Sequence, residues 1–273
     1  MSQDNQRYHS FPKDDILLRL PVKSLMRFMC VSQSWKSLIF SPDFVKLHLQ
    51  RSPKNTDFLL LRIDTHPDPA IVLSYTLDSL KNKTNPPFTQ SLGFSQDLKF
   101  CHWVNSSING LSCVSSYVSN DTEYKIYNVR LWNPITRLTS AASQPLYVEN
   151  RSACIVKFGL GYDDSTDTYK VVVNIIDREQ WKNELRVYSR GDTCWRTVSV
   201  SPEDLLFSWE ESQFVCNSFN WLVIQPSEPV DRKRLDRFEY TNDDYFIFSL
   251  DAGEKTQKLL RMPPDLDVKN RRW

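Results

Sequence analysis

No uninterrupted apolar run in this chain approaches the roughly 20 residues that are needed to cross a bilayer. The first ten residues, MSQDNQRYHS, are polar and lack the apolar core of a secretory signal peptide. The net charge is only +1, which gives no general attraction toward nucleic acid or a membrane surface. These absences predict a cytoplasmic or nuclear protein whose partners include neither nucleic acid nor a membrane.

Motifs of the common catalytic and metal sites are also missing. The six cysteines form no Cys-x-x-Cys pair, so no structural zinc site is expected and the thiols are predicted to be reduced. The four histidines, His9, His48, His66 and His102, lie far apart in the sequence and lack ligand spacing. There is no P-loop, no G-x-S-x-G elbow and no H-E-x-x-H. We therefore expect a protein that is not an enzyme, with no catalytic residue, no metal and no cofactor.

Short runs of like charge leave two alternatives open. The carboxylate pairs Asp163-Asp164 and Asp243-Asp244 each fall in a predicted turn, which favours solvated turn acids over a catalytic pair. The basic runs at 232–234 and 269–272 are compatible with nuclear import or nucleic-acid binding, but their shortness favours solvated loops.

The stretch from Phe11 to Leu49 has apolar residues at helical spacing, and its prolines divide it into short pieces. We expect helices over Asp14–Leu20, from Pro21 as a first-turn residue, after Ser32 as an N-cap, and after Ser41 as an N-cap. A cluster of about four short helices buries too little apolar surface to be stable alone, so it should pack on the rest of the chain or on a partner. Residues 1–56 hold nine Lys or Arg and four Asp or Glu, which suits an acidic partner surface or a solvated face.

This stretch resembles the F-box of the large plant F-box family. The similar run is ILLRLPVKSLMRFMCVSQSWKSLIFSPDF, and its matching residues are Leu17, Leu20, Pro21, Val22, Lys23, Ser24, Leu25, Phe28, Cys30, Val31, Ser32, Trp35, Ser41, Pro42 and Phe44. In that family the F-box docks on a Skp-type adaptor and joins the protein to a cullin ubiquitin ligase. The resemblance implies adaptor-binding residues at Pro12, Ile16, Leu17, Leu20, Pro21, Val22, Lys23, Leu25, Val31 and Trp35. Spacing alone leaves open a helical cluster that serves only as an N-terminal core.

One departure from the family pattern concerns the first helix. Family members usually open with Leu-Pro, an acidic pair and several more residues, whereas Phe11-Pro12-Lys13-Asp14-Asp15 runs straight into Ile16 here. The first helix is therefore expected to be about one turn short, and that turn contributes adaptor contacts in the family. A target-binding scaffold or decoy that engages no ligase is accordingly the alternative function.

The sequence changes character after Arg51. We assign an F-box domain to residues 11–50, a polar linker to 51–57 and an all-β domain to 58–273. Three segments, which start at Tyr127, Leu185 and Tyr245, repeat a strand, a polar turn and a second strand at spacings of 58 and 60 residues. Periods near about 50 residues are typical of kelch-type propeller blades, so the domain is predicted to be antiparallel and propeller-like.

These repeats resemble the plant F-box-associated domain of the S-locus F-box proteins and their kelch-like relatives. The matching motifs are Asn109-Gly110-Leu111, LWNPITR from Leu131, FGLGYD from Phe158 (with Leu160 in place of a phenylalanine), DTYKVV from Asp167, Val187-Tyr188-Ser189 with Trp195-Arg196, FNWL from Phe219 and IFSLD from Ile247. The resemblance implies that this domain recruits a protein target.

Glycine and tryptophan positions carry further expectations. Gly159 and Gly161 predict a bulge or a close approach of another segment to the backbone. Trp132, Trp195 and Trp221 recur in the strand segments and are predicted to pack between neighbouring blades.

Residues 57–273 suffice for about four blades at roughly 50 residues each. Four is the smallest ring usually formed, and the repeats are irregular, which predicts an open or imperfectly closed array. The strand near Tyr245–Leu250, or one close to Arg261, is then expected to lack its usual neighbour, and residues 265–273 to be loosely held.

The sequence thus predicts a small all-α F-box cluster followed by an all-β propeller-like domain. Its predicted function is that of the substrate-recognition subunit of a Skp–cullin–F-box ubiquitin ligase, with the F-box on the adaptor and the β domain on an unknown protein target. Within the F-box, Trp35 is expected to be buried against Leu20 and Phe28.

Overall fold

The computed structural model describes residues 12–51, 57–62, 71–76, 88–89, 103–120, 123–134, 136–151, 154–180, 182–202, 205–208, 210–225 and 242–263. The chain divides into two compact units, Met1–Arg62 with Ile71–Leu92, and Ile63–Ala70 with Gly93–Trp273. The basic runs at 232–234 and 269–272 and the tail 265–273, on which predictions were made, lie outside the described residues.

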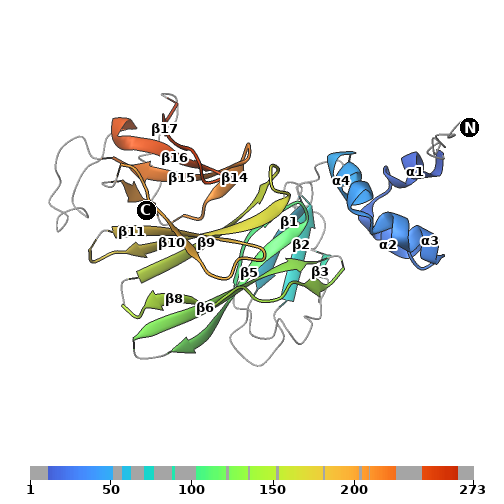
Figure 1. Cartoon of the computed structure of the whole chain (residues 1–273), viewed down its shortest axis with the longest axis horizontal. Coiled ribbons are helices and arrows are strands. Elements are labelled where there is room, and N and C mark those ends of the chain that lie inside the picture. The colour runs from blue at the N-terminus through green and yellow to red at the C-terminus, as the bar shows by residue number, and fades with distance from the viewer. Residues whose placement is uncertain are drawn as a thin grey trace, which may run out of the picture. The chain divides into compact units, whose positions relative to one another are not determined.

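Four short helices form in the first unit (Figure 1): α1 (Pro12–Leu17), α2 (Val22–Phe28), α3 (Gln33–Ile39) and α4 (Pro42–Arg51). The predicted caps are confirmed, because the Ser32 hydroxyl accepts a hydrogen bond from the backbone N–H of Trp35 at 3.2 Å and the Ser41 hydroxyl accepts one from Phe44 at 3.3 Å. Pro21 is the N-cap of α2 rather than its first helical residue. Helix α1 ends at Leu17, before the predicted Leu20, because a proline disfavours helical geometry in the residue that precedes it.

The helices share a small apolar core made of Leu17, Leu18, Leu25, Ile39 and Phe44. Trp35 packs at the edge of this core beside Phe28, with ring centroids 5.2 Å apart in an edge-to-face arrangement. Leu20 packs against the same core. The expected contact of Trp35 with Phe28 is therefore confirmed, while its contact with Leu20 stays a prediction. The expected burial of Trp35 is only partial.

The first unit also contains an antiparallel sheet, β1 (Asp57–Arg62), β2 (Ile71–Thr76) and β3 (Phe88–Thr89), in that order. Its register runs from Asp57 opposite Thr76 to Arg62 opposite Ile71. The predicted strands at Phe58 and Ile71 are thus confirmed, while the predicted domain boundaries at 50 and 57 stay predictions.

The second unit holds three further antiparallel sheets. The β4–β8 sheet consists of β4 (Trp103–Ile108), β5 (Leu111–Asn120), β6 (Tyr124–Asn133), β7 (Leu138–Thr139) and β8 (Leu146–Glu149), with both β7 and β8 paired to β6. The β9–β12 sheet consists of β9 (Cys154–Asp163), β10 (Thr168–Asp177), β11 (Lys182–Ser189) and β12 (Arg196–Val198). The β13–β17 sheet consists of β13 (Leu206–Phe207), β14 (Gln213–Val215), β15 (Ser218–Ile224), β16 (Tyr245–Asp251) and β17 (Gln257–Arg261), with the short 3-10 helix η3 (Asn242–Asp244) before β16. In this last sheet both β13 and β14 pair with β15. The predicted fold class, a helical segment followed by antiparallel β-sheets, is confirmed.

The three predicted repeat hairpins occupy equivalent places in these sheets. The segment from Tyr127 lies in the β6–β7 hairpin, that from Leu185 in β11–β12, and that from Tyr245 in β16–β17. In each hairpin the second strand, β7, β12 or β17, stands at the end of the strand order of its own four- or five-stranded sheet, as expected of a repeated blade unit.

The prediction that Tyr245–Leu250 is an unpaired edge is wrong. This segment belongs to β16, which pairs with β15 on one side, Tyr245 opposite Ile224, and with β17 on the other, Phe246 opposite Arg261. Among the described strands the edge is β17, close to Arg261, which is the alternative that the sequence left open. The prediction was based on chain length, and it did not foresee that a strand as short as the five residues of β17 would pair with β16. The open array stays a prediction.

Two apolar cores lie between the sheets of the second unit. One joins the β4–β8 and β9–β12 sheets through residues such as Leu146, Val148, Phe158 and Val173, and the other joins the β9–β12 and β13–β17 sheets through Val187, Phe207, Trp221 and Phe248. Strand β10 faces both cores, which explains its nearly continuous apolar run, VVVNII.

The tryptophans contribute to these contacts between sheets. Trp221 is buried in the core between the β9–β12 and β13–β17 sheets. Trp195 packs against the other core, and its indole N–H donates to the backbone oxygen of Gln144, in the segment between β7 and β8, at 2.9 Å. These two positions confirm the predicted packing between neighbouring sheets, and Trp132 is likewise buried.

Close approach, rather than a bulge, explains the glycines of β9. The pairing of β9 with β10 is regular throughout. A Cβ atom on Gly159 would lie 1.9 Å from Oγ of Ser212, and one on Gly161 would lie 2.3 Å from Cζ of Phe219. Strand β15, with Phe219, and the segment between β13 and β14, with Ser212, therefore pack directly on the backbone of β9.

Candidate functional site

The predicted adaptor-binding residues separate into a buried and an exposed group. Leu17 and Leu25 are 4% and 3% exposed and belong to the helical core, where Leu20 and Trp35 also pack. The members that remain exposed are Ile16, Pro21, Val22, Lys23 and Val31. The side chain of Pro12 lies outside the described part of the structure, although its backbone begins α1.

The exposed apolar members of this set are unusual for a small helical module. Ile16 is 61% exposed, Val31 67% and Val22 36%. Phe40, the C-cap of α3, is exposed as well, and so are Val45, Leu47 and Leu49 of α4. Exposed apolar residues are ordinary when scattered, but a cluster of only 40 residues that shows this many has surface available for a partner.

Polar contacts link helix α4 to Asp15 of α1 and to Leu20, which follows α1. The imidazole Nε2 of His48 lies 2.8 Å from the backbone oxygen of Leu20. Arg51 forms a hydrogen-bonded ion pair with Asp15, which Arg19 also approaches. The hydrogen bond from Arg51 is the main cause of the lowered pKa of Asp15. These contacts fix α1, which carries Ile16, against the rest of the helical cluster.

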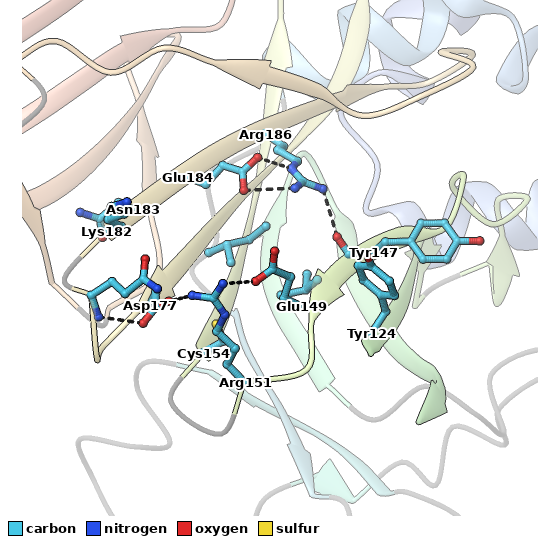
Figure 2. Close-up of a pocket in the computed structure, with 13 residues that line it drawn as sticks. Tyr124, Tyr147, Glu149, Arg151, Cys154, Asp177, Lys182, Asn183, Glu184 and Arg186 are labelled. Carbon is cyan, nitrogen blue, oxygen red and sulfur yellow. Dashed lines mark hydrogen bonds and ion pairs between the residues drawn. The ribbon is translucent and has the colours of Figure 1, made fainter. Parts of the chain in front are cut away.

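A pocket of about 380 Å³ opens between the β4–β8 and β9–β12 sheets of the second unit (Figure 2). It is lined by Tyr124, Tyr147, Val148, Glu149, Arg151, Cys154, Ile175, Asp177, Gln180, Lys182, Asn183, Glu184 and Arg186. Val148 and Ile175 are almost fully buried members of the core between these sheets, so they supply the apolar part of the lining. None of these residues was predicted as a site from the sequence.

One side of the pocket is organised around Arg151 (Figure 2). Its Nη1 donates to Oδ2 of Asp177 at 2.8 Å, and its Nη2 forms an ion pair with Glu149. Burial alone would raise the pKa of Asp177, but hydrogen bonds from the backbone N–H of Gln180, from Arg151 and from the backbone N–H of Glu179 lower it. Arg151 follows β8 and Asp177 ends β10, so this ion pair links the two sheets.

Arg186 forms the opposite side. Its Nε and Nη2 donate to the two carboxylate oxygens of Glu184 at 2.7 and 3.1 Å, a bidentate arrangement within β11. Its Nη1 donates to the backbone oxygen of Tyr147 in β8 at 3.1 Å. The guanidinium is thus held in one plane and links the same two sheets a second time.

Two tyrosines form one end of the pocket (Figure 2). The rings of Tyr124 and Tyr147 meet edge to face with centroids 6.2 Å apart, and the residues are 39% and 52% exposed. Lys182 lies at the other end. Cys154 also lines the pocket, and burial raises the pKa of its thiol, so that it stays neutral near pH 7.

A sequence signal for this pocket does exist. Glu149 and Arg151 are two residues apart in and after β8, and Glu184 and Arg186 are two residues apart in β11. Residues two apart in a strand share a face, so each pair places an acid and a base side by side. The spacing within each pair can be read from the sequence. That the two pairs line one pocket cannot, because it depends on how the two sheets pack.

A second charged cluster, around Lys170, lies between the β9–β12 and β13–β17 sheets. The ammonium of Lys170 donates to the backbone oxygen of Ala252 at 2.6 Å and to Oε1 of Glu254 at 3.1 Å, and it lies 3.1 Å from Oδ2 of Asp163. Glu254 also accepts from Arg196 at 2.9 Å. This cluster connects β9 and β10 with the turn between β16 and β17.

The prediction that Asp163 is a solvated turn acid is therefore wrong. The residue is 1% exposed. Burial alone would raise the pKa of its carboxyl, but polar contacts with Ser165, Lys170 and Thr166 outweigh it and hold that pKa well below its usual range. Its neighbour Asp164 is exposed, as predicted.

Three further observations concern metal-binding groups, membrane spans and cysteines. Within the described residues, no three His, Cys, Asp or Glu side chains are grouped so that they could hold a metal ion. In the same residues no helix has the length and apolar character of a membrane span. The described cysteines, Cys30, Cys113, Cys154, Cys194 and Cys216, are free thiols.

Comparison with known proteins gives two family matches along the chain. Residues 13–47 match the F-box domain, and residues 63–218 match the F-box associated beta propeller domain. The first covers nearly the whole helical cluster, and the second includes the sheets that form the pocket.

Several Arabidopsis thaliana proteins are similar to the chain. An F-box/kelch-repeat protein is 30% identical over 232 residues, which are 80% of this chain and 60% of that protein. A putative F-box protein is 26% identical over 259 residues, 89% of this chain and 54% of its own length. The F-box protein CPR1 is 30% identical over 204 residues, 71% and 46% of the two chains. The chain thus matches only about half of the length of these curated relatives.

Proposed function

Because this chain belongs to the plant F-box family that carries an F-box associated β-propeller domain, we propose that it is a substrate-recognition subunit of a Skp–cullin–F-box ubiquitin ligase. The helical cluster binds a Skp-type adaptor, through which the cullin is reached, and the β-sheets of the second unit recruit a protein target. Ubiquitin transfer takes place elsewhere in the complex, so this chain is not an enzyme and needs no catalytic residue, metal or cofactor. The proposed location is the cytoplasm, the nucleus or both.

The observation that supports this proposal most is the exposure of apolar residues where the F-box match lies. Ile16 and Val31 are well over half exposed, while the neighbouring Leu17 and Leu25 fill the core. A helical cluster that served only as an N-terminal core would need the buried residues but not the exposed apolar ones. Apolar side chains around which a partner can exclude water are the usual centres of protein interfaces.

The test is a binding measurement between the full chain and a purified Skp-type adaptor. We expect a dissociation constant in roughly the micromolar range or tighter. Val31→Asp and Ile16→Asp should each weaken binding about tenfold or more, since each buries a charge in the interface. Val215→Asp is the matched control, because Val215 is a 56% exposed valine in the other unit.

The same measurement distinguishes the alternative function, a target-binding scaffold or decoy. Helix α1 has six residues, and a first helix that is too short for the adaptor would support that alternative. Absence of binding at micromolar concentrations by a folded chain would overturn the ligase proposal. Equal losses in Val31→Asp and in the Val215→Asp control would overturn the assignment of the surface.

A further inference from the structure

The pocket between the β4–β8 and β9–β12 sheets has the features of a preformed recognition site. Its volume of about 380 Å³ lies within the range of roughly 300–1,000 Å³ that is usual for ligand pockets. The two links across it, from Arg151 to Asp177 and from Arg186 to the backbone of Tyr147, hold its sides in place. A site that is already rigid loses little conformational entropy when it binds.

The charges of the lining decide which kind of ligand fits. The lining holds three acids and three bases, so its charges balance as a whole. Arg151 is shared by Glu149 and Asp177, Arg186 pairs with Glu184, and Lys182 is the third base. A basic ligand would have to compete with the two arginines for these carboxylates, and an acidic one with the carboxylates for the guanidinium groups. Displacing a partner from such a pair leaves a charge uncompensated, so an uncharged side chain is favoured.

The remaining surfaces favour an aromatic ring among uncharged side chains. Tyr124 and Tyr147 present partly exposed rings at one end of the pocket, whereas Val148 and Ile175 line it as almost fully buried core residues. The guanidinium plane of Arg186 is fixed next to Tyr147. Tyrosine rings and guanidinium planes both stack on aromatic rings, and aromatic residues are the most frequent anchors of protein interfaces.

We propose that this pocket is the target-recognition site, and that it takes one uncharged aromatic side chain from an extended segment of the target protein. The proposal rests on the proposed function for the existence of a target. The ring lies against the two tyrosines. The peptide N–H groups on either side of it donate to the carboxylates of the lining, whose oxygens keep lone pairs beyond those that the arginines use.

The first experiment uses the full chain and small capped amino acids as probes. In saturation-transfer NMR, N-acetylphenylalaninamide should receive saturation at its ring protons, and N-acetylleucinamide, N-acetyllysinamide and N-acetylaspartamide much less. Tyr147→Ala should weaken binding of the phenylalanine probe about tenfold, the loss typical of an interface anchor. Trp103→Ala is the matched control, because Trp103 is 51% exposed and does not line the pocket.

A second readout locates the probe. Because Cys154 lines the pocket, a bound probe should slow alkylation of Cys154 by iodoacetamide, measured by mass spectrometry, but not that of the exposed Cys194. Equal binding of the charged or leucine probes, unchanged binding in Tyr147→Ala, or no protection of Cys154 would overturn the proposal.

Adaptor binding is measured on the same samples and separates the two proposals. A chain that binds the adaptor but not the phenylalanine probe refutes the pocket assignment and leaves the ligase function standing. A chain that binds the probe but not the adaptor refutes the ligase function and supports the pocket.

Discussion

Lys170 offers the sharpest test of how the β-sheets are held together. Its side chain is 9% exposed, and its ammonium is the cation between Asp163 and Glu254, whose side chains are 1% and 10% exposed. Replacing it in Lys170→Met keeps most of the aliphatic length and removes the charge. Glu254 retains Arg196 as a partner, so the carboxylate that is left without a cation is chiefly that of Asp163, which keeps only its hydrogen bonds from Ser165 and Thr166.

The expected loss of stability follows from leaving the buried carboxylate of Asp163 without its cation. Removing one partner of a buried ion pair costs about 3–5 kcal/mol, because the other charge stays buried without compensation. With an m-value of about 2–3 kcal/mol per molar urea, the unfolding midpoint should fall by about 1–2.5 M. Intrinsic tryptophan fluorescence can follow the transition, since Trp221 is buried between the two sheets that the cluster joins.

Two variants make this test specific. Lys258→Met removes the same charge from an exposed position in β17 and should change stability by less than about 0.5 kcal/mol. Adding Asp163→Asn to Lys170→Met removes the uncompensated carboxylate and should restore about 1 kcal/mol or more. If Lys170→Met were as stable as the Lys258→Met control, or if the double variant were no more stable than Lys170→Met alone, the cluster would not hold the sheets as argued.

Three further outcomes are expected. Gly161→Ala should destabilise the second unit by about 1–3 kcal/mol in urea unfolding, since its Cβ would overlap Phe219 and Phe214; native stability would contradict the close approach. Trp35→Ala should destabilise the helical cluster by about 2–3 kcal/mol, less than a fully buried tryptophan would, in thermal melts where Val31→Asp stays near native. Because the folded pKa of Asp163 is depressed, its stabilisation is present above the unfolded value of about 4 and is lost as the pH falls below it. Acid unfolding of Asp163→Asn should therefore depend less steeply on pH below 4 than that of the native chain, and identical slopes would refute this.

Local signals in the sequence predicted local structure well. The caps at Ser32 and Ser41 depend on hydroxyl groups next to helical runs, and the hairpins after Tyr127, Leu185 and Tyr245 depend on apolar runs around polar turns. The capping residues are three positions apart, and the paired residues of the hairpins are at most as far apart as Phe246 and Arg261. A short stretch of sequence therefore contains both partners of each interaction.

Predictions that required distant contacts succeeded less often. Asp163 was assigned to solvent because it stands beside a turn, but its burial depends on Lys170 across the β9–β10 hairpin and on Glu254 from another sheet. The pocket was missed for the same reason. Its acid–base pairs are visible in sequence two residues apart, but no local pattern indicates that Arg186 reaches the backbone of Tyr147.

The residues that match the F-box motif must be sorted into buried and exposed ones before the motif is used to choose variants. Its matching residues include Leu25, which is 3% exposed, and Val31, which is 67% exposed. If the helical cluster binds an adaptor as proposed, replacing either residue can abolish that binding, but for different reasons. Loss of Leu25 removes core packing from a cluster with little apolar surface to spare, so binding fails because the helices unfold. A charge at Val31 leaves the core intact, so binding fails only if the adaptor covers that side chain. Variants chosen from the motif alone would mix these two effects, and only the exposed positions report on the interface.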